Sequence, residues 1–273
     1  MDGRTGGESE PLARAAAEWA VAGHVQVGRR RIRYRAAGQG PAVVLVHGLS
    51  MSADYWVRNA AEIAAGGYRV LAPDLPGFGT TEGPTEGLSV SRQAAAIHRW
   101  MEAMELGSAV LAGHSISCQS VLELAAARPE HVRGLILIAP TGDRKRGLLL
   151  RQAWGLLRDS WREPPTLLAL AAQAYFRAGP HRFLNTWKMG ARHDPIALLP
   201  AIAAPALVLL GTADPVVEPE FAQQIADGIP SGRLTMIEDG THGLILSKPR
   251  EVNAAILEFL GEIAGREFRL SPE

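Results

Sequence analysis

Short runs of branched apolar residues alternate with longer helix-patterned segments along most of this 273-residue chain. Short apolar runs of this kind are typical of buried strands, and the helical segments between them serve as crossover connections. The alternation therefore predicts an α/β fold with a mostly parallel central sheet and helices on both faces. The expected strands are 24–27, 31–36, 42–46, 69–72, 109–112, 135–138, 206–210 and 233–237, and the expected helices are 53–65, 89–104, 116–127, 218–229 and 249–263.

A serine lies on the turn between the expected strand 109–112 and the helix that follows it. The residues Gly113-His114-Ser115-Ile116-Ser117 match the pattern G-x-S-x-G except at the last position, where serine replaces glycine. On a sharp strand-to-helix turn the Ser115 hydroxyl points outward, and the Ile116 amide faces any negative charge that develops there. Ser115 is therefore a candidate nucleophile. The pentapeptide alone is also compatible with an ordinary turn of small residues, since short glycine patterns recur by chance.

Two later turns carry the residues that such a serine needs. Asp214 follows the expected strand 206–210, and His242 follows the expected strand 233–237. A histidine can take the serine proton and return it to the leaving group, while a carboxylate orients the imidazole. Asp143 is the alternative acid, since it follows the strand 135–138. We favour Asp214, because the basic run 144–146 can pair with Asp143 at the surface.

With these turns in place, the chain resembles an α/β-hydrolase-fold enzyme from its first strands to its last helix. The order Ser115, Asp214, His242 is the order of that family. Residues 43–49 are similar to the family's strand-3 His-Gly turn, and residues 74–79 are similar to its strand-4 turn. These ordered motifs together carry the resemblance.

The resemblance implies further roles around the serine. It implies that the backbone amides of Leu49 and Ile116 form the oxyanion hole, with the Ser50 hydroxyl as a helper. It also implies that His47 supports the oxyanion loop and is not the base. Asp74 is expected to bond turn amides, as aspartates often do.

Residues 142–200 interrupt the alternation of strands and helices. A crossover needs only about a dozen residues, so this stretch has room for several helices and is expected to be a helical cap inserted after the sixth core strand. The expected substrate pocket includes Ser50 and His114 from the core and Trp154, Trp161 and Trp187 from the cap. The cap also contains six arginines, any of which could bind a substrate carboxylate if it pointed inward: Arg151, Arg158, Arg162, Arg177, Arg182 and Arg192.

The expected organisation is one enzyme domain. Residues 1–10 are expected to be disordered, residues 11–141 and 201–273 to form the core, and residues 142–200 to form the cap. No signal peptide or apolar membrane span is recognisable, so a cytoplasmic protein is expected. The single cysteine, Cys118, excludes an internal disulfide and a cysteine-based zinc site.

Composition and motifs exclude several partners. The 28 basic and 28 acidic residues balance, and the cluster Arg29-Arg30-Arg31 is interpreted as an exposed strand face, so no nucleic-acid partner is expected. No membrane partner is expected either, since no apolar span is recognisable. The histidine spacing indicates no metal site, and no phosphate loop or dinucleotide fingerprint occurs. We therefore expect no cofactor. The sequence leaves the oligomeric state open.

The predicted activity is acyl transfer to water by a serine hydrolase. Its substrate is expected to be a small, largely apolar carboxylic ester or lactone, because the cap is rich in tryptophan and leucine. The alternatives are hydrolysis of a carbon–carbon bond in a vinylogous diketone, a thioesterase and a perhydrolase. A non-catalytic relative that binds a small molecule is the alternative from another class, since a fold does not fix a function.

Overall fold

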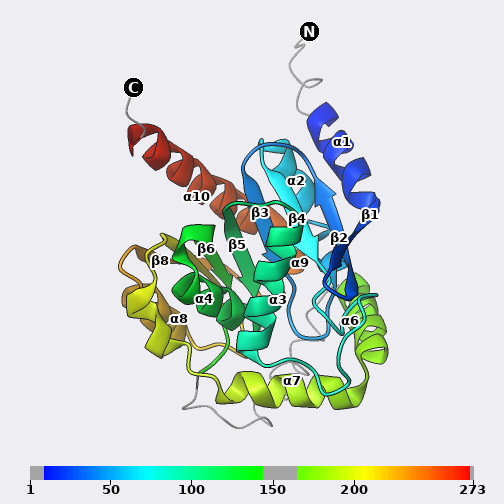
Figure 1. The fold of residues 1–273 in the computed structure, drawn as a ribbon. Coiled ribbons are helices and arrows are strands. Elements are labelled where there is room, and N and C mark those ends of the chain that lie inside the picture. The colour runs from blue at the N-terminus through cyan, green and yellow to red at the C-terminus, as the bar shows by residue number, and fades with distance from the viewer. Residues whose placement is uncertain (1–8, 144–164, 271–273) are drawn as a thin grey trace.

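The computed structural model describes residues 9–143 and 165–270, and its centre is an eight-stranded sheet (Figure 1). The strands are β1 Ala22–Val27, β2 Arg30–Ala37, β3 Ala42–Val46, β4 Arg69–Pro73, β5 Ala109–His114, β6 Val132–Ile138, β7 Ala206–Gly211 and β8 Gly232–Ile237. Their order across the sheet is β1-β2-β4-β3-β5-β6-β7-β8. The pairs β1–β2 and β2–β4 are antiparallel and the other neighbours are parallel. The predicted mostly parallel sheet is confirmed, with all eight expected strands.

The central strands are buried on both faces, as their apolar sequences require. All six residues of β5 and of β7 are buried. Helices α3 Val90–Ala103 and α4 Ser117–Ala127 cover the near face in Figure 1, and α10 Pro249–Leu270 passes behind the sheet. The remaining core helices are α2 Ala60–Ala65, α8 Pro219–Gly228 and α9 Leu244–Ser247, with short 3-10 turns η1 Ala53–Trp56 and η2 Pro129–His131.

The structure differs from the helix predictions in two places. The helix expected at 53–65 is divided into η1 and α2, and Asn59, which precedes α2, is buried and donates its side-chain amide to Asn253 Oδ1 at 2.8 Å. Helix α1 Ser9–Ala20 was not predicted, and it begins inside the segment 1–10 that was expected to be disordered. Its Ala15 and Trp19 are buried four residues apart, on one side of the helix.

Helices α6 Pro165–Ala178 and α7 Pro180–Arg192, followed by η4 Ile196–Ala201, lie between β6 and β7, where the cap was expected. We call α6 and α7 the roof helices. In Figure 1, α7 crosses the lower end of the molecule below α3 and α4, while α1 and the C-terminal end of α10 lie at the opposite end. The cap residues Trp154 and Trp161, with Arg151, Arg158 and Arg162, fall outside the described residues.

An ionic quartet links β2 to η1 and to the turn after β4, and its members Arg33 and Asp74 are buried while Arg35 and Asp54 are partly exposed. Arg33 Nη1 donates to Asp74 Oδ2 at 3.1 Å, and its Nη2 donates to Asp54 Oδ1 at 2.7 Å. Arg35 donates to the same Asp54 oxygen and to the carbonyls of Trp19 and Ala20 at the end of α1. Asp74 also accepts turn amides, as expected, from Ala53 at 2.8 Å and from Thr80 at 3.0 Å. The cluster Arg29–Arg31 is exposed.

Candidate active site

Ser115 lies in a strained turn between β5 and α4. Its φ is +58°, a left-handed conformation that non-glycine residues adopt at a cost of about 1–3 kcal/mol. The turn is held by the Ser115 amide, which donates to the Ile138 carbonyl at 2.8 Å. Close packing explains Gly113, because a Cβ there would lie 2.9 Å from the amide nitrogen of Cys118. This is the sharp strand–turn–helix geometry that the sequence pattern predicts.

Ser117 fits this crowded turn because its hydroxyl has a partner. The side chain is buried, and its Oγ donates a hydrogen bond to the carbonyl of His47, the residue after β3. The register of the sheet brings these segments together, since Val46 pairs with Gly113. Serine at the position usually taken by glycine therefore adds a bond between the two turns.

Ser115, His242 and Asp214 form one chain of hydrogen bonds. The distance from His242 Nε2 to Ser115 Oγ is 3.0 Å, and the distance from His242 Nδ1 to Asp214 Oδ2 is 2.9 Å. The second carboxylate oxygen of Asp214 accepts the amides of Val216 at 2.7 Å and Val217 at 3.0 Å. The three turns after β5, β7 and β8 thus bring together the three side chains that the sequence singled out.

The electrostatics keep Asp214 ionised. Burial alone would raise the pKa of this carboxyl, but the charge and hydrogen bond of His242 and the two valine amides outweigh burial and hold the pKa below its usual value. An ionised, buried carboxylate next to Nδ1 favours the imidazole tautomer that leaves Nε2 free to accept the Ser115 proton.

Two other histidines, His114 and His47, flank the site but do not take part in the hydrogen bonds that link Ser115, His242 and Asp214. Burial, with the nearby charge of His242, lowers the pKa of His114 to about 3, so its ring is neutral near pH 7. Its Nε2 lies 2.9 Å from the His242 carbonyl and donates to it, and the two ring centroids are 5.3 Å apart. His114 therefore positions the loop that carries His242.

His47 has both ring nitrogens engaged by backbone groups. Its Nδ1 donates to the Gly48 carbonyl at 2.8 Å, and its Nε2 accepts the Leu75 amide at 3.0 Å. Burial lowers the pKa of His47, which keeps this ring neutral as well. These bonds fit the supporting role that the family resemblance implies for His47.

The two expected oxyanion donors are available. Among the hydrogen bonds of the described residues, none uses the amide of Leu49 or of Ile116 as donor. Ser50, next to Leu49, has a φ of 60° and is buried, and its hydroxyl has no partner in the described part of the chain. A polar group left without a partner at this place is available to a bound substrate oxygen.

The sequence did not single out Tyr55 or the role of Arg182. The Tyr55 ring lies 5.3 Å from that of His114, and Tyr55 lines a small cavity with Met51 and Arg177. The Arg182 guanidinium donates to the carbonyls of Gly77 at 2.7 Å, Pro84 at 3.0 Å and Gly83 at 3.3 Å. The guanidinium also donates to the carbonyl of Ala178, one turn earlier along the chain, at 3.0 Å. The other three acceptors are distant in sequence, so no local pattern indicates them.

The roof closes over the nucleophile turn at α7. A Cβ on Gly190 would lie 2.4 Å from Cδ1 of Ile116, so the backbone of α7 passes directly against the residue after Ser115. Trp187, one turn earlier, is half-buried and packs on Phe183 with ring centroids 5.9 Å apart. Of the three tryptophans expected at the pocket, Trp187 is the one within the described residues.

Other chemistry has less support. Among residues 9–143 and 165–270, no group of three or more His, Cys, Asp or Glu side chains could hold a metal ion. Cys118 is buried, and burial raises the pKa of its thiol far above the usual value, so it is not a reactive thiolate.

Comparison with known proteins places the chain in a family. The sequence model described as "Alpha/beta hydrolase family" matches residues 43–255, which include all three turns. This chain belongs to the alpha/beta hydrolase family. As a hydrolase of this family it is similar to human monoacylglycerol lipase ABHD6, with 23% identity over 260 residues that cover 83% of this chain and 77% of the lipase.

Solved structures give the same fold for this hydrolase. A membrane phospholipase A described as a bacterial virulence factor has a TM-score of 0.78 and 25% identity, covering 94% of this chain and 92% of that one. Est816, described as an N-acyl homoserine lactone degrading enzyme, has a TM-score of 0.75 and 24% identity. The match covers 87% of this chain and 100% of Est816. None of the hydrolase's described helices combines the length and apolar character needed to cross a bilayer.

Proposed function

We propose that this hydrolase cleaves a small, largely apolar carboxylic ester or lactone through an acyl-enzyme on Ser115. The observation that carries the proposal is the continuous chain Ser115 Oγ, His242 Nε2, His242 Nδ1 and Asp214 Oδ2, with steps of 3.0 and 2.9 Å. These separations lie within the range required for proton transfer between a nucleophile and its base.

Each group has a definite task in this mechanism. Ser115 Oγ attacks the substrate carbonyl while His242 Nε2 takes its proton, and Asp214 stabilises the imidazolium that forms. The amides of Leu49 and Ile116 donate to the oxyanion. His242 then protonates the leaving alcohol, and a water molecule releases the acyl group by the same steps in reverse.

The roof supports an uncharged substrate. A buried carboxylate on the substrate would need a cation beside it. Arg182 is engaged by four backbone carbonyls, and Arg192 is exposed. Of the cap arginines within the described residues, Arg177 borders the cavity with Met51 and Tyr55, but it is exposed to solvent, which weakens the case for a diketone acid. The lipase, phospholipase and lactone-degrading relatives are named for ester or lactone chemistry, which agrees with the proposal.

The decisive experiment combines a substrate panel with an active-site label. The panel holds p-nitrophenyl esters from acetate to decanoate, an acyl thioester, an N-acyl homoserine lactone and a ring-fission diketone acid. We expect turnover of esters or lactones, and a fluorophosphonate probe should label Ser115, as located by peptide mass spectrometry. A preference of a hundredfold or more for the diketone acid would overturn the ester assignment.

A second result would overturn catalysis altogether. If the intact protein neither turned over the panel nor reacted with the fluorophosphonate, while small esters still raised its melting temperature, the site would be a binding site. The Ser115→Ala variant serves as the control for labelling, because it should keep the fold and lose the label.

A further inference from the structure

The charges of this chain are unevenly distributed, although they balance overall. Residues 144–193 contain ten of the 28 Lys and Arg residues but only two of the 28 Asp and Glu residues. Between residues 165 and 193, which include both roof helices, the sequence has no Asp or Glu at all. The cap region is therefore strongly basic, and the rest of the chain is correspondingly acidic.

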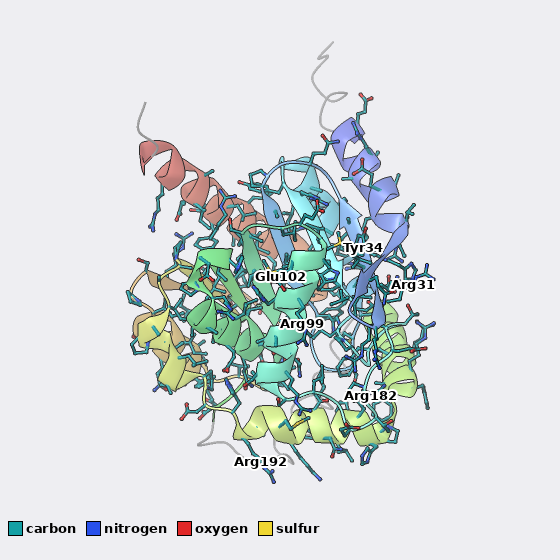
Figure 2. All side chains as sticks on the ribbon, in the orientation of Figure 1. Arg31, Tyr34, Arg99, Glu102, Arg182 and Arg192 are labelled. Atoms are coloured by element: carbon teal, nitrogen blue, oxygen red, sulfur yellow. The ribbon has the colours of Figure 1, made fainter. Side chains whose placement is uncertain are left out.

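The outer side of α7 presents this positive charge to solvent. His181, Leu184, Lys188 and Arg192 recur at intervals of three or four residues, which places them on one face of the helix. All four are exposed, whereas Thr186 and Gly190 are buried on the side toward the core. In Figure 2, Arg192 projects from α7 away from the body of the molecule.

Large apolar side chains are exposed beside these charges. Phe176, in the last turn of α6, is 81% exposed, and Leu184 of α7 is 45% exposed. Tyr175 is also partly exposed, and its ring lies 5.4 Å from that of Phe183, so the end of α6 adjoins the start of α7. We call the following residues the docking face: Tyr175, Phe176, Leu184, Lys188 and Arg192.

We propose that the docking face binds the surface of a bilayer that contains anionic phospholipids. This inference goes beyond the proposed hydrolase activity and does not depend on it. Exposed aromatic and aliphatic side chains enter the boundary between headgroups and acyl chains, while Lys and Arg beside them attract anionic headgroups. A nucleic-acid surface would use the charges but would gain little from an exposed leucine.

Peripheral docking needs no membrane-spanning helix. The sequence-based expectation of no membrane partner rests on the lack of an apolar span, and it does not bear on a helix that lies in the interface. The opposite side of α7 touches the nucleophile turn, where Gly190 meets Ile116. A bilayer on the docking face would therefore lie just outside the roof of the site.

Vesicle sedimentation with the full chain tests this proposal. Vesicles of pure phosphatidylcholine are compared with vesicles that contain 30% phosphatidylglycerol, at low salt and in 0.5 M NaCl. We expect binding to the anionic vesicles at low salt, with at least a tenfold preference over neutral vesicles, and we expect salt to abolish it.

Variants locate the contact. Each basic side chain near an anionic surface contributes about fivefold in affinity, so the double variant Lys188→Glu/Arg192→Glu should weaken binding at least twenty-fivefold. The matched control Arg99→Glu/Arg266→Glu changes the net charge equally at exposed positions of α3 and α10 and should bind within threefold of the wild type. Phe176→Ala should weaken binding about tenfold, because it removes the aromatic side chain that is most exposed among the described residues.

Three outcomes would overturn the proposal. They are no binding to anionic vesicles at low salt, equal losses in the roof and control double variants, and tighter binding to duplex DNA than to anionic vesicles at the same salt. Melting temperatures of the variants confirm that the fold is intact, and all the altered side chains are exposed, so folding should be preserved.

Discussion

The floor and the roof of this site are held in different ways. The floor consists of the turns after β3, β5, β7 and β8, and its histidines His47, His114 and His242 each have a ring nitrogen bonded to a neighbouring turn. In the roof, by contrast, the guanidinium of Arg182 makes three of the polar contacts with the core. Among the described residues, the floor side chains that surround the site also hold its turns together, whereas Arg182 holds the roof to the core from outside the chain of hydrogen bonds between Ser115, His242 and Asp214.

The largest effect should come from the floor. Ser115→Ala removes the proposed nucleophile, and we expect kcat/KM for the best ester to fall by at least about a thousandfold. Folding should be unchanged, because the hydroxyl is the only group lost. Steady-state kinetics and a thermal melt measure the two quantities. Residual activity above about a thousandth of wild type would show that another group attacks the substrate.

The choice of acid is the next test. Asp214→Asn should lower kcat by about 10³–10⁴-fold, because an amide favours the wrong imidazole tautomer. Asp143→Asn is the matched control and should retain activity within tenfold. Near-wild-type rates for Asp214→Asn together with a collapse for Asp143→Asn would reverse the assignment.

The roof should give an intermediate effect of a different kind. Arg182→Met leaves the carbonyls of Gly77, Gly83 and Pro84 without their donor, so we expect KM for a soluble ester to rise about tenfold and the free energy of unfolding to fall by about 2 kcal/mol. kcat should change less than KM, because the floor is untouched. Arg192→Met alters an exposed arginine of the same helix and should change neither quantity more than twofold. A fall in kcat alone would contradict the division between floor and roof.

The buried His114 predicts how stability depends on pH. Its pKa is lowered from 6.5 to about 3 on folding, so the unfolded state binds more protons between these values. The contribution of the neutral His114 to the free energy of unfolding is therefore fully present above pH 6.5. It decreases as pH falls toward 3, by up to about 1.4 kcal/mol per pH unit. His114→Gln should show a shallower decline in urea unfolding between pH 6 and pH 4. Parallel curves for the two proteins would refute this prediction.

The smallest effect is expected at Ser117. Ser117→Gly removes the bond to the His47 carbonyl but restores the residue that this turn most readily accommodates, so activity should stay within about tenfold of wild type. Kinetics on the preferred ester measure this change. A loss as large as that of Ser115→Ala would mean that Ser117 itself takes part in the chemistry.

Local sequence patterns predicted most of the floor. Apolar runs marked all eight strands, and the turns that carry Ser115, Asp214 and His242 each follow such a run. Because the carboxyl ends of parallel strands lie at the same edge of a sheet, this was enough to predict that the three side chains lie at one edge. The division of 53–65 before α2 was not predicted, and the partner of the buried Asn59 at this point, Asn253, is 194 residues away, so no local pattern indicates their contact. Helix α1 was missed although the sequence carries its signals, since Arg14 and Glu18 form an i,i+4 ion pair at 3.0 Å and Ala15 and Trp19 are spaced for one buried side.

The ionic quartet of Arg33, Arg35, Asp54 and Asp74 affects how this protein could be changed by directed evolution. Arg33 and Asp74 form its buried pair, and removing one of them leaves an uncompensated charge, which typically costs about 3–5 kcal/mol, whereas replacing both with apolar residues can be neutral. Single mutations at these two positions should therefore be eliminated in selections, and only coordinated changes should survive. Libraries that seek new substrates should keep the quartet fixed and place their diversity in α6 and α7.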